Sequence, residues 1–307
     1  MKSLDHSTGT VESRACFCGL LLVAILLAWV ALPDAANASE ASDDVCVMTY
    51  NLRYANENPG EAWSSRRALL TECIRAVGPD IMGTQEGLYP QLRDIAADLP
   101  DLDWIGLGRQ GGSRDEFTAV FFRRARLEPL EFDHFWLSDT PDVIGSATWG
   151  NTYRRMVTWV HFRDKQTHQE FFVWNTHLDH QVQEARVKSA ALIRERIGRI
   201  DRNTPVLLIG DFNADAATND VHRMLVDDGG LTDMWSAAAA RRGGERGTFN
   251  GFGDFSLGFV RIDWILARGD VQADSAEVVE FTKDGRFPSD HFPVVAHLRI
   301  GAHAAHP

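Results

Sequence analysis

The chain is organised around one ten-residue segment, Pro205-Val206-Leu207-Leu208-Ile209-Gly210-Asp211-Phe212-Asn213-Ala214. Its apolar first half is typical of a β-strand that is buried on both faces. Gly210 ends the apolar run, and alternation along a strand would point Asp211 and Asn213 to the same side. A carboxylate and a carboxamide on one side suit a site that handles a phosphate, a metal and a water. The structural alternative is an Asx-type turn formed by the same two residues.

Polar side chains also stand at the ends of three other predicted strands, 45–50, 80–85 and 171–174. The residues that follow these strands are Asn51, then Glu86, and then Asn175, His177, Asp179 and His180. Asp263 lies inside the apolar strand 261–266, where an unpaired carboxylate would be strongly disfavoured. We therefore expect Asp263 to have a partner. The pair Asp290-His291, just before the strand that begins at residue 292, can supply an imidazole.

Taken in chain order, these segments resemble one enzyme superfamily, the endonuclease/exonuclease/phosphatase superfamily. The group includes pancreatic-type deoxyribonucleases, abasic-site endonucleases, sphingomyelinases and inositol-phosphate 5-phosphatases. The resemblance covers residues 45–300. It rests on Thr49-Tyr50-Asn51-Leu52, Gln85-Glu86, Asn175-Thr176-His177-Leu178-Asp179-His180, Gly210-Asp211-Phe212-Asn213, Arg261-Ile262-Asp263 and Ser289-Asp290-His291. It implies a four-layer α/β/β/α sandwich of two packed mixed sheets, as in deoxyribonuclease I, whereas the spacing of elements alone indicates only an α/β fold.

The resemblance also implies a role for each matching residue. Glu86 matches the principal metal carboxylate, Asn51 lies beside it, and Asp290 matches a residue near a second metal position. Asp211 matches the acid that orients or deprotonates the attacking water, and Asn213 matches the amide that holds the phosphate.

Two histidines complete the implied site. His291, with Asp263 as its carboxylate partner, matches the essential histidine near the scissile phosphate. His177 matches the histidine on the opposite side of the phosphate. Glu116 matches the acid that pairs with this second histidine in the deoxyribonucleases.

Four further residues are candidates for contact with the substrate phosphate. Arg155 belongs to an arginine-x-x-Thr-Trp pattern that resembles a bacterial exported subset of the superfamily, and a guanidinium fits phosphate in a forked way. A surface arginine is the alternative. Asn175 is a candidate contact or a strand cap, and Asp179 and His180 are candidate contacts or ordinary loop residues. The loop 108–116 departs from the subset, which puts the substrate-facing contacts in doubt.

The inventory of acids, amides and two histidines predicts metal-assisted hydrolysis by water. Oxygen ligands suit Mg²⁺, Mn²⁺ or Ca²⁺, and such a metal stabilises charge that builds on a phosphate. We expect a phosphodiesterase or nuclease first. The alternatives are a phosphatase or phosphodiesterase on a lipid head group or sugar phosphate, and a binding module that has lost catalysis. We expect a monomer without an obligate protein partner, whose partner is a phosphoester substrate, with nucleic acid among the candidates. The net charge of −12 weakens that last reading, because an acidic protein is not drawn to polyanions.

The N-terminus predicts export. An uncharged apolar run of 18 residues, 15–32, follows Lys2 and Arg14 and precedes Ala36-Asn37-Ala38. This pattern is typical of a cleaved signal peptide over residues 1–38 and a periplasmic or secreted protein. An uncleaved membrane anchor is the alternative. Residues 39–300 then form one domain, and 301–307 a disordered tail.

Coarser predictions concern the remaining elements and the cysteines. Apolar spacing predicts helices over 64–77, 89–99 and 182–200, strands over 104–107 and 117–122, and a hairpin of 156–162 with 170–174. Cys46 and Cys73 remain after export, and they form either a disulfide or two buried thiols.

Overall fold

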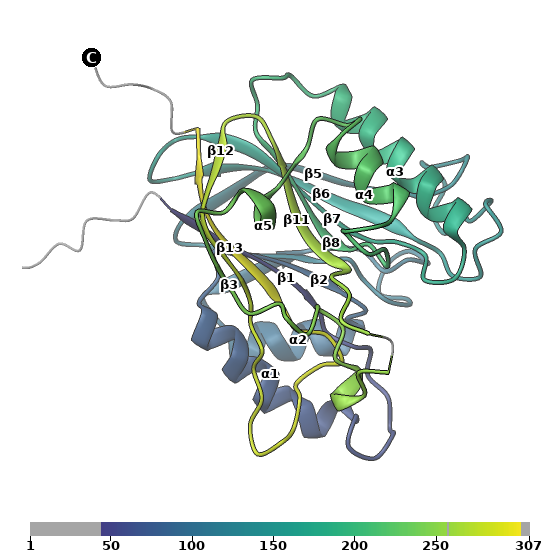
Figure 1. Cartoon of the computed structure of the whole chain (residues 1–307), viewed down its shortest axis with the longest axis vertical. Coiled ribbons are helices and arrows are strands. Elements are labelled where there is room, and N and C mark those ends of the chain that lie inside the picture. Colours follow the sequence, from purple (N-terminus) through teal and green to yellow (C-terminus); the bar gives the residue numbers. More distant parts are fainter. Residues whose placement is uncertain (1–43, 257, 302–307) are drawn as a thin grey trace, which may run out of the picture. The chain divides into compact units, whose positions relative to one another are not determined.

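The computed structural model of the chain describes residues 44–256 and 258–301, which form two stacked mixed β-sheets (Figure 1). The seven-stranded sheet has the order β10 (Ala240–Arg242), β12 (Val271–Val278), β13 (Val294–Ile300), β1 (Val45–Asn51), β2 (Ile81–Gln85), β4 (Val120–Arg123) and β3 (Leu102–Ile105). The six-stranded sheet has the order β5 (Leu127–Trp136), β6 (Met156–Asp164), β7 (Glu170–His177), β8 (Val206–Asp211), β11 (Asp263–Arg268) and β9 (Thr232–Asp233). The pairs β1–β2 and β7–β8 are parallel, and most other pairs are antiparallel.

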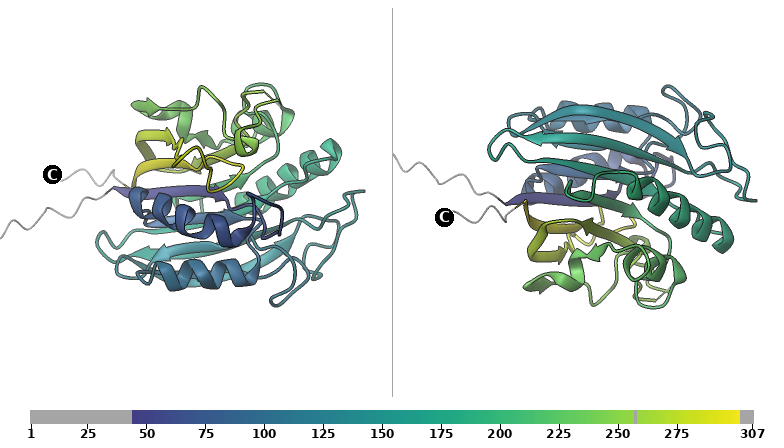
Figure 2. Two further views of the ribbon diagram at one scale, coloured as in Figure 1. Left: turned by 90° about the horizontal axis from the view of Figure 1, so that it is seen from below. Right: turned by 90° about the horizontal axis from the view of Figure 1, so that it is seen from above.

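Helices cover the outer faces of both sheets. The helices are α1 (Trp63–Val77), α2 (Tyr89–Asp98), α3 (Gln183–Gly198), α4 (Asp220–Val226) and α5 (Met234–Ala237), with a 3₁₀ turn at Gly251–Gly253. In Figure 2, α1 and α2 lie in front in the left panel, seen from below, and α3 lies in front in the right panel, seen from above. These helices are therefore on opposite sides of the two sheets. Side chains of α1 and α2 share an apolar cluster with β1, β2 and β4, and those of α3 and α4 share one with β7, β8 and β11. The predicted four-layer sandwich is therefore confirmed.

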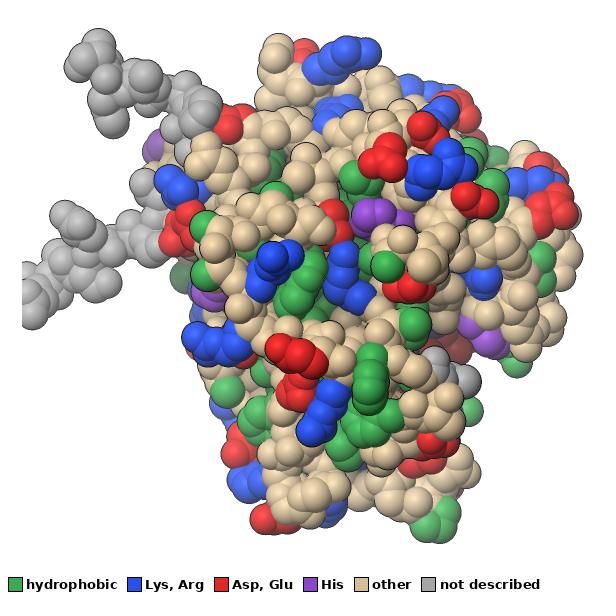
Figure 3. All heavy atoms as spheres, in the orientation of Figure 1, with side chains coloured by type: hydrophobic (Ala, Val, Ile, Leu, Met, Phe, Trp, Pro, Cys, Tyr) green, Lys and Arg blue, Asp and Glu red, His purple; other side chains and the backbone are tan. Residues whose placement is uncertain are grey.

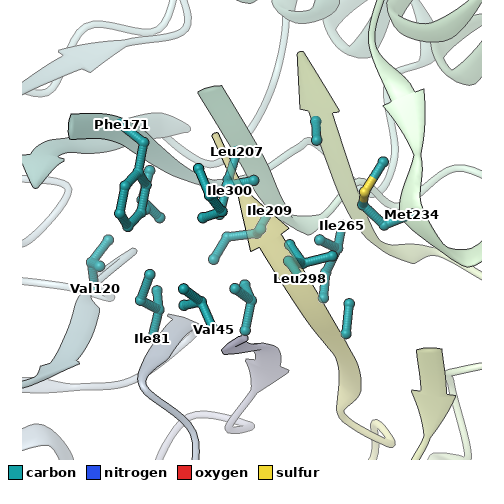
Figure 4. Close-up of a cluster of buried hydrophobic side chains, with 14 of the residues drawn as sticks. Val45, Ile81, Val120, Phe171, Leu207, Ile209, Met234, Ile265, Leu298 and Ile300 are labelled. Carbon is teal, nitrogen blue, oxygen red and sulfur yellow. The ribbon is translucent and has the colours of Figure 1, made fainter. Parts of the chain in front are cut away.

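The strand β8 is buried on both faces, as predicted, because it feeds two different cores. Leu207 and Ile209 point into the space between the sheets, and Leu208 points outward under α3 and α4. Figure 4 shows the inner core, in which Leu207 and Ile209 meet side chains of the other sheet such as Ile81. Each fully buried aliphatic side chain stabilises the fold by about 1.5–3 kcal/mol relative to exposure.

The stacking brings the functional strand ends to one edge of the molecule. Asn51 ends β1, and His177 and Asp211 end the parallel neighbours β7 and β8 in direct register. Asp263 begins the antiparallel strand β11 directly opposite Asp211. Gly210 makes this possible: its φ is 152°, and a Cβ there would lie 2.1 Å from the carbonyl oxygen of Thr176. No other residue fits so close to a neighbouring backbone.

Several predicted boundaries shift by a few residues. The helices predicted at 64–77, 89–99 and 182–200 are α1, α2 and α3, and the hairpin is β6–β7. The strands expected at 104–107 and 117–122 are β3 and β4, with boundaries displaced by one to three residues. Two long strands, β5 and β12, are absent from the predictions. Most of β5 is exposed and β12 is only partly buried, so neither has the apolar alternation that reveals a strand.

Cys46 and Cys73 are both buried free thiols, which leaves the disulfide alternative without support. None of the helices formed by the described residues is long and apolar enough to cross a bilayer. The predicted leader, 1–38, and the tail after Gly301 lie outside the described residues.

Candidate active site

A cavity of about 720 Å³ opens at the edge where the strand ends meet. Its wall contains most of the predicted site residues together with two arginines that sequence reasoning did not select. The predicted residues on the wall are Glu86, Glu116, Arg155, His177, His180, Asp211, Asn213, Asp290 and His291, and the additional arginines are Arg53 and Arg109.

The carboxylate of Asp211 is the point on which the site converges. Its Oδ2 accepts a hydrogen bond from Asn51 Nδ2 at 3.0 Å. The same oxygen lies 3.5 Å from His177 Nε2 and 3.8 Å from His291 Nε2. Burial, with the nearby carboxylate of Asp263, raises the pKa of Asp211 to about 7. Near neutral pH such a group can both accept and release a proton.

Asp211 also makes the turn that was the structural alternative. Its Oδ1 accepts the backbone N–H of Asn213 at 2.9 Å, and Asn213 has a left-handed φ of 47°. One carboxylate oxygen therefore shapes the chain while the other faces the site. The amide Nδ2 of Asn213 donates to the carbonyl of Leu178 at 3.1 Å. Because Asn213 leaves the strand, it is this turn, and not strand alternation, that places it on the cavity.

His291 is paired with Asp263, as predicted. Its Nδ1 lies 2.9 Å from Asp263 Oδ2, and both side chains are buried. Burial opposes a charge on His291, but the hydrogen bond and the charge of Asp263, together with Asp211 and Asp290, outweigh it and raise the pKa of His291 to about 10. The ring is therefore an imidazolium at neutral pH, with Nε2–H facing Asp211.

The predicted direct pairing of Glu116 with His177 is corrected by the structure, because Arg109 lies between them. Arg109 Nη2 is 3.0 Å from His177 Nδ1 and 2.6 Å from Glu116 Oε2. Burial lowers the pKa of His177 well below its usual range, and the charges of Arg155 and Arg109 lower it further. The sequence contains one indication of Arg109, which is that the loop 108–116 departs from the family pattern.

The opposite side of the cavity is acidic. Glu86 follows β2 with a left-handed φ of 63°, and its carboxylate accepts from Asn51 Nδ2 at 3.1 Å and from the backbone N–H of Tyr54 at 3.2 Å. Burial raises the pKa of Glu86, but His291, Asn51 and Arg53 overcome this and lower it. Burial and the charge of Glu86 raise the pKa of Asp290.

These residues fit a divalent cation. Arg53 Nη1 lies 3.4 Å from Asp290 Oδ2 and 4.0 Å from Glu86 Oε2, so two facing carboxylates already share one positive group. The two carboxylates offer oxygen donors, which hard cations prefer, whereas the Asn51 amide turns its Nδ2 toward Glu86 and its Oδ1 accepts the backbone N–H of Arg53 at 3.0 Å. A second group, Asp211, Asp263 and His291, offers ligand atoms within 4.8 Å of one another. Within this group His291 Nδ1 and Asp263 Oδ2 already share a hydrogen bond, so the Glu86 side suits a cation better.

Arg155 is buried, with 4% of its surface exposed, so the surface-arginine alternative is wrong. Its Nη2 lies 3.0 Å from His180 Nδ1, whereas Nε and Nη1 have no hydrogen-bond partner among the described residues. Burial and the nearby Arg109 lower the pKa of Arg155 to about 10, which leaves it charged at neutral pH. His180 is exposed, and its ring centre lies 5.5 Å from that of Tyr153.

Two predicted phosphate contacts lie outside the cavity wall. Asn175 is buried between the sheets, where Nδ2 donates to the carbonyls of Thr84 and Ala119, and Oδ1 accepts from Gln85 Nε2 at 2.7 Å. Asp179 Oδ1 accepts the backbone N–H groups of Gln181 and Val182 and so shapes the turn that leads into α3. Both side chains therefore stabilise the fold and do not line the cavity. A polar residue near a strand end looks the same in the sequence in either role.

Residues 48–291 match the model of the Endonuclease/Exonuclease/phosphatase family. The chain belongs to this family. Membership places the chain among phosphoester hydrolases, a group that depends on divalent metal ions.

Solved structures of the family align over most of the chain. A family protein of Bacteroides thetaiotaomicron is 36% identical, with a TM-score of 0.79 over 83% of this chain and 97% of that one. A mannosyl-6-phosphatase of Bacteroides thetaiotaomicron VPI-5482 is 35% identical, with a TM-score of 0.77 over 83% of this chain and 99% of that one. The uncharacterized protein L388 of Acanthamoeba polyphaga mimivirus is 32% identical over 162 residues, which are 50% of this chain and 60% of the viral protein. The match with the viral protein thus covers less than two thirds of its length.

Proposed function

We propose that the chain is a divalent-metal-dependent phosphatase that removes a terminal phosphate from a small polar molecule, such as a sugar phosphate. The observation that carries this proposal is Arg155, a buried and charged guanidinium on the cavity wall with two unpaired nitrogen donors. The family relative named as a mannosyl-6-phosphatase supports the same substrate class.

The charge of the cavity favours a phosphate monoester over a diester. A terminal phosphate carries close to two negative charges and three acceptor oxygens, whereas a diester carries one charge. Arg155 and Arg109 bring two buried positive charges to one side of the cavity, and the guanidinium of Arg155, with two unpaired nitrogens, can meet two phosphate oxygens at once. On the face drawn in Figure 3, basic side chains lie among acidic ones, and the net charge is −12. Neither feature suits a polyanionic nucleic acid.

Each protein group has a defined task in this proposal. Glu86 and Asp290, with Asn51 beside them, would hold Mg²⁺, with Mn²⁺ or Ca²⁺ as alternatives, and the bound ion would supply Lewis-acid neutralisation of phosphate charge. Asp211 Oδ2 orients the attacking water and accepts its proton. The His291 imidazolium stabilises negative charge that builds on the phosphate. The N–H groups of His177 and Asn213 are donors for phosphate oxygens.

We also propose that the protein acts as a monomer outside the cytoplasm, after removal of residues 1–38. The basic, apolar and small-residue segments of the N-terminus support export and removal of this leader. N-terminal sequencing of the exported protein should find a start near Ser39. A membrane-embedded product that retains Met1 would favour the anchor instead.

A substrate panel tests the function. The purified protein with Mg²⁺ or Mn²⁺ is assayed on mannose 6-phosphate, glucose 6-phosphate, p-nitrophenyl phosphate, bis(p-nitrophenyl) phosphate, single-stranded DNA and sphingomyelin. We expect the highest kcat/KM on a sugar phosphate. Cleavage of DNA, sphingomyelin or the diester faster than of the sugar phosphates would overturn the monoester assignment and favour a phosphodiesterase.

The neighbouring arginine provides a matched control. Arg154 is exposed, whereas Arg155 is buried on the cavity wall. Arg155→Met should lower kcat/KM on the monoester by roughly 10- to 100-fold, the scale of a hydrogen bond to a charged group. The loss on the diester should be smaller, and Arg154→Met should leave both rates close to wild type. Equal losses of kcat/KM on both substrates would show that Arg155 does not cause a preference for the monoester.

A further inference from the structure

We propose that Arg109 is a positioning residue that holds His177 as the neutral tautomer with its proton on Nε2. His177 then acts as a hydrogen-bond donor in the cavity and not as an acid. The effect on turnover rests on the phosphatase function proposed above, whereas the tautomer itself does not.

The contacts of the ring decide its tautomer. A guanidinium nitrogen can only donate a hydrogen bond. Arg109 Nη2 lies 3.0 Å from His177 Nδ1, so Nδ1 must offer its lone pair. The remaining proton of a neutral ring is then on Nε2, which faces Asp211 Oδ2 at 3.5 Å. Arg109 thus aims the single N–H of His177 at the carboxylate on which the site converges.

The backbone holds Arg109 firmly in this place. Its carbonyl accepts the indole N–H of Trp136 at 2.8 Å, and its N–H donates to the carbonyl of Glu116 at 3.0 Å. The preceding Gly108 packs so tightly that a Cβ would lie 2.0 Å from the carbonyl oxygen of Arg114. Only 1% of Arg109 is exposed. A side chain this constrained can fix the ring of its neighbour.

Arg109 also reverses the influence of Glu116 on the ring. A carboxylate in direct contact with an imidazole favours the charged ring. Here the carboxylate of Glu116 contacts the guanidinium at 2.6 Å, and the guanidinium faces the ring. Glu116 therefore offsets the cost of burying Arg109, while Arg109 disfavours a second positive charge on His177. Burial and the charge of Arg155 lower the pKa of His177 in the same sense.

The tautomer is measured directly, without substrate or metal. Long-range ¹H–¹⁵N spectra of ¹⁵N-histidine-labelled protein are recorded across a pH series for wild type, Arg109→Met, Arg109→Lys and the control Arg93→Met. His177→Gln assigns the signal. Arg93 is an exposed arginine of α2 that is absent from the cavity wall. We expect a neutral Nε2–H ring in wild type and in the control. In Arg109→Met we expect mixed tautomers and a raised pKa, and in Arg109→Lys a return toward the wild-type tautomer, because an ammonium also donates to Nδ1.

Kinetics separate positioning from substrate contact. Arg109→Met should lower kcat by no more than about 10-fold, the lower end of the losses that follow removal of an orienting partner, with little change in KM and partial recovery in Arg109→Lys. An unchanged His177 tautomer in Arg109→Met overturns the proposal. This holds whether the variant keeps the wild-type rate or shows only a raised KM. If the methionine variant is unfolded by circular dichroism, the lysine variant and wild type decide, and a charged or Nδ1–H ring in wild type overturns the proposal. A wild-type protein that cleaves no phosphoester refutes the proposed function but leaves the tautomer result standing.

Discussion

The two histidines of the cavity have similar positions and opposite electrical states. Each places Nε2 within 4 Å of Asp211 Oδ2, at 3.5 Å for His177 and 3.8 Å for His291. Behind the ring, His291 has a carboxylate and a pKa raised to about 10, whereas His177 has a guanidinium and a lowered pKa. Burial disfavours the charge on both rings, but Asp263 and the other carboxylates overcome it at His291, whereas the charges of Arg155 and Arg109 add to it at His177.

This difference matters for phosphate chemistry. A charged ring stabilises negative charge, whereas a neutral ring offers only a directed N–H. Two imidazolium groups beside Arg155 would concentrate positive charge in a buried space, at a high desolvation cost. The site instead keeps one ring charged and the other neutral around a single carboxylate. Four predictions test this arrangement, from the largest expected effect to the smallest.

Metal removal should have the largest effect, because the division of labour between the rings assumes a cation on the Glu86 side. We expect EDTA to abolish turnover and Mg²⁺ or Mn²⁺ to restore it. Thermal melting should shift upward on adding the cation, since a ligand that binds only the folded state stabilises it. Glu86→Gln should show a weaker shift. Full activity in excess chelator would contradict the assignment.

Loss of the charged ring should have the next largest effect. His291→Ala should lose on the order of 10²-fold or more in kcat, the scale of one acid–base group. Asp263→Asn should lose a large part of this, because it removes the group that holds the ring charged. Residues that act as one unit give non-additive losses, so the double variant should be little worse than His291→Ala. If the double variant is folded and its loss equals the product of the two single losses, His291 and Asp263 do not act as one unit.

Replacement of each histidine by glutamine should sharpen the contrast between them. Glutamine keeps an N–H donor but carries no charge. His177→Gln should therefore lose less than about 10-fold in kcat, whereas His291→Gln should lose on the order of 10²-fold. Both rates are measured on the best substrate of the panel, with folding checked by circular dichroism. Equal losses would mean that the rings do not differ in charge.

The smallest effect concerns two thiols, Cys46 and Cys73, at which desolvation outweighs the neighbouring groups that lower the thiol pKa. Burial disfavours a thiolate and raises the pKa of Cys46 and of Cys73 to about 12. At pH 8 both thiols should be protonated and should not react with Ellman's reagent in the folded protein, with activity unchanged. In denaturant the same two groups should react, because the thiol pKa returns to its ordinary value. Rapid labelling of the folded protein would contradict their burial.

Most of the fold could be predicted because its determinants are local or come in a fixed order. The apolar run before Asp211 predicted a strand buried on both faces, and the family resemblance carried by six motifs implied the stacked sheets. The position of Asp263 within an apolar strand predicted that its carboxylate has a partner, because burying an unpaired carboxylate is too costly. The strand β5 escaped prediction because an exposed edge strand has no apolar face to display.

The site could be predicted less completely, because polar residues at strand ends look alike in sequence. Asn175 and His177 lie at the end of β7 and Asp179 just after it, yet Asn175 ties the sheets together and Asp179 shapes the turn before α3. Arg53 and Arg109 lie in loops without a periodic pattern. Nothing in their neighbours along the chain shows that each will face a carboxylate or a ring far away in sequence.

The sequence by itself determined which chemical groups are present and the strands that carry them, because strand periodicity and the cost of burying a charge act along the chain. Only the tertiary structure decided the charge state of each group. That state depends on which atom lies within about 3 Å of the ring in a dry environment, where electrostatic interactions are strong. Arg109 and Glu116 are 68 and 61 positions from His177 in the chain, and Asp263 is 28 positions from His291. Folding brings these partners together and makes one histidine a cation and the other a neutral donor.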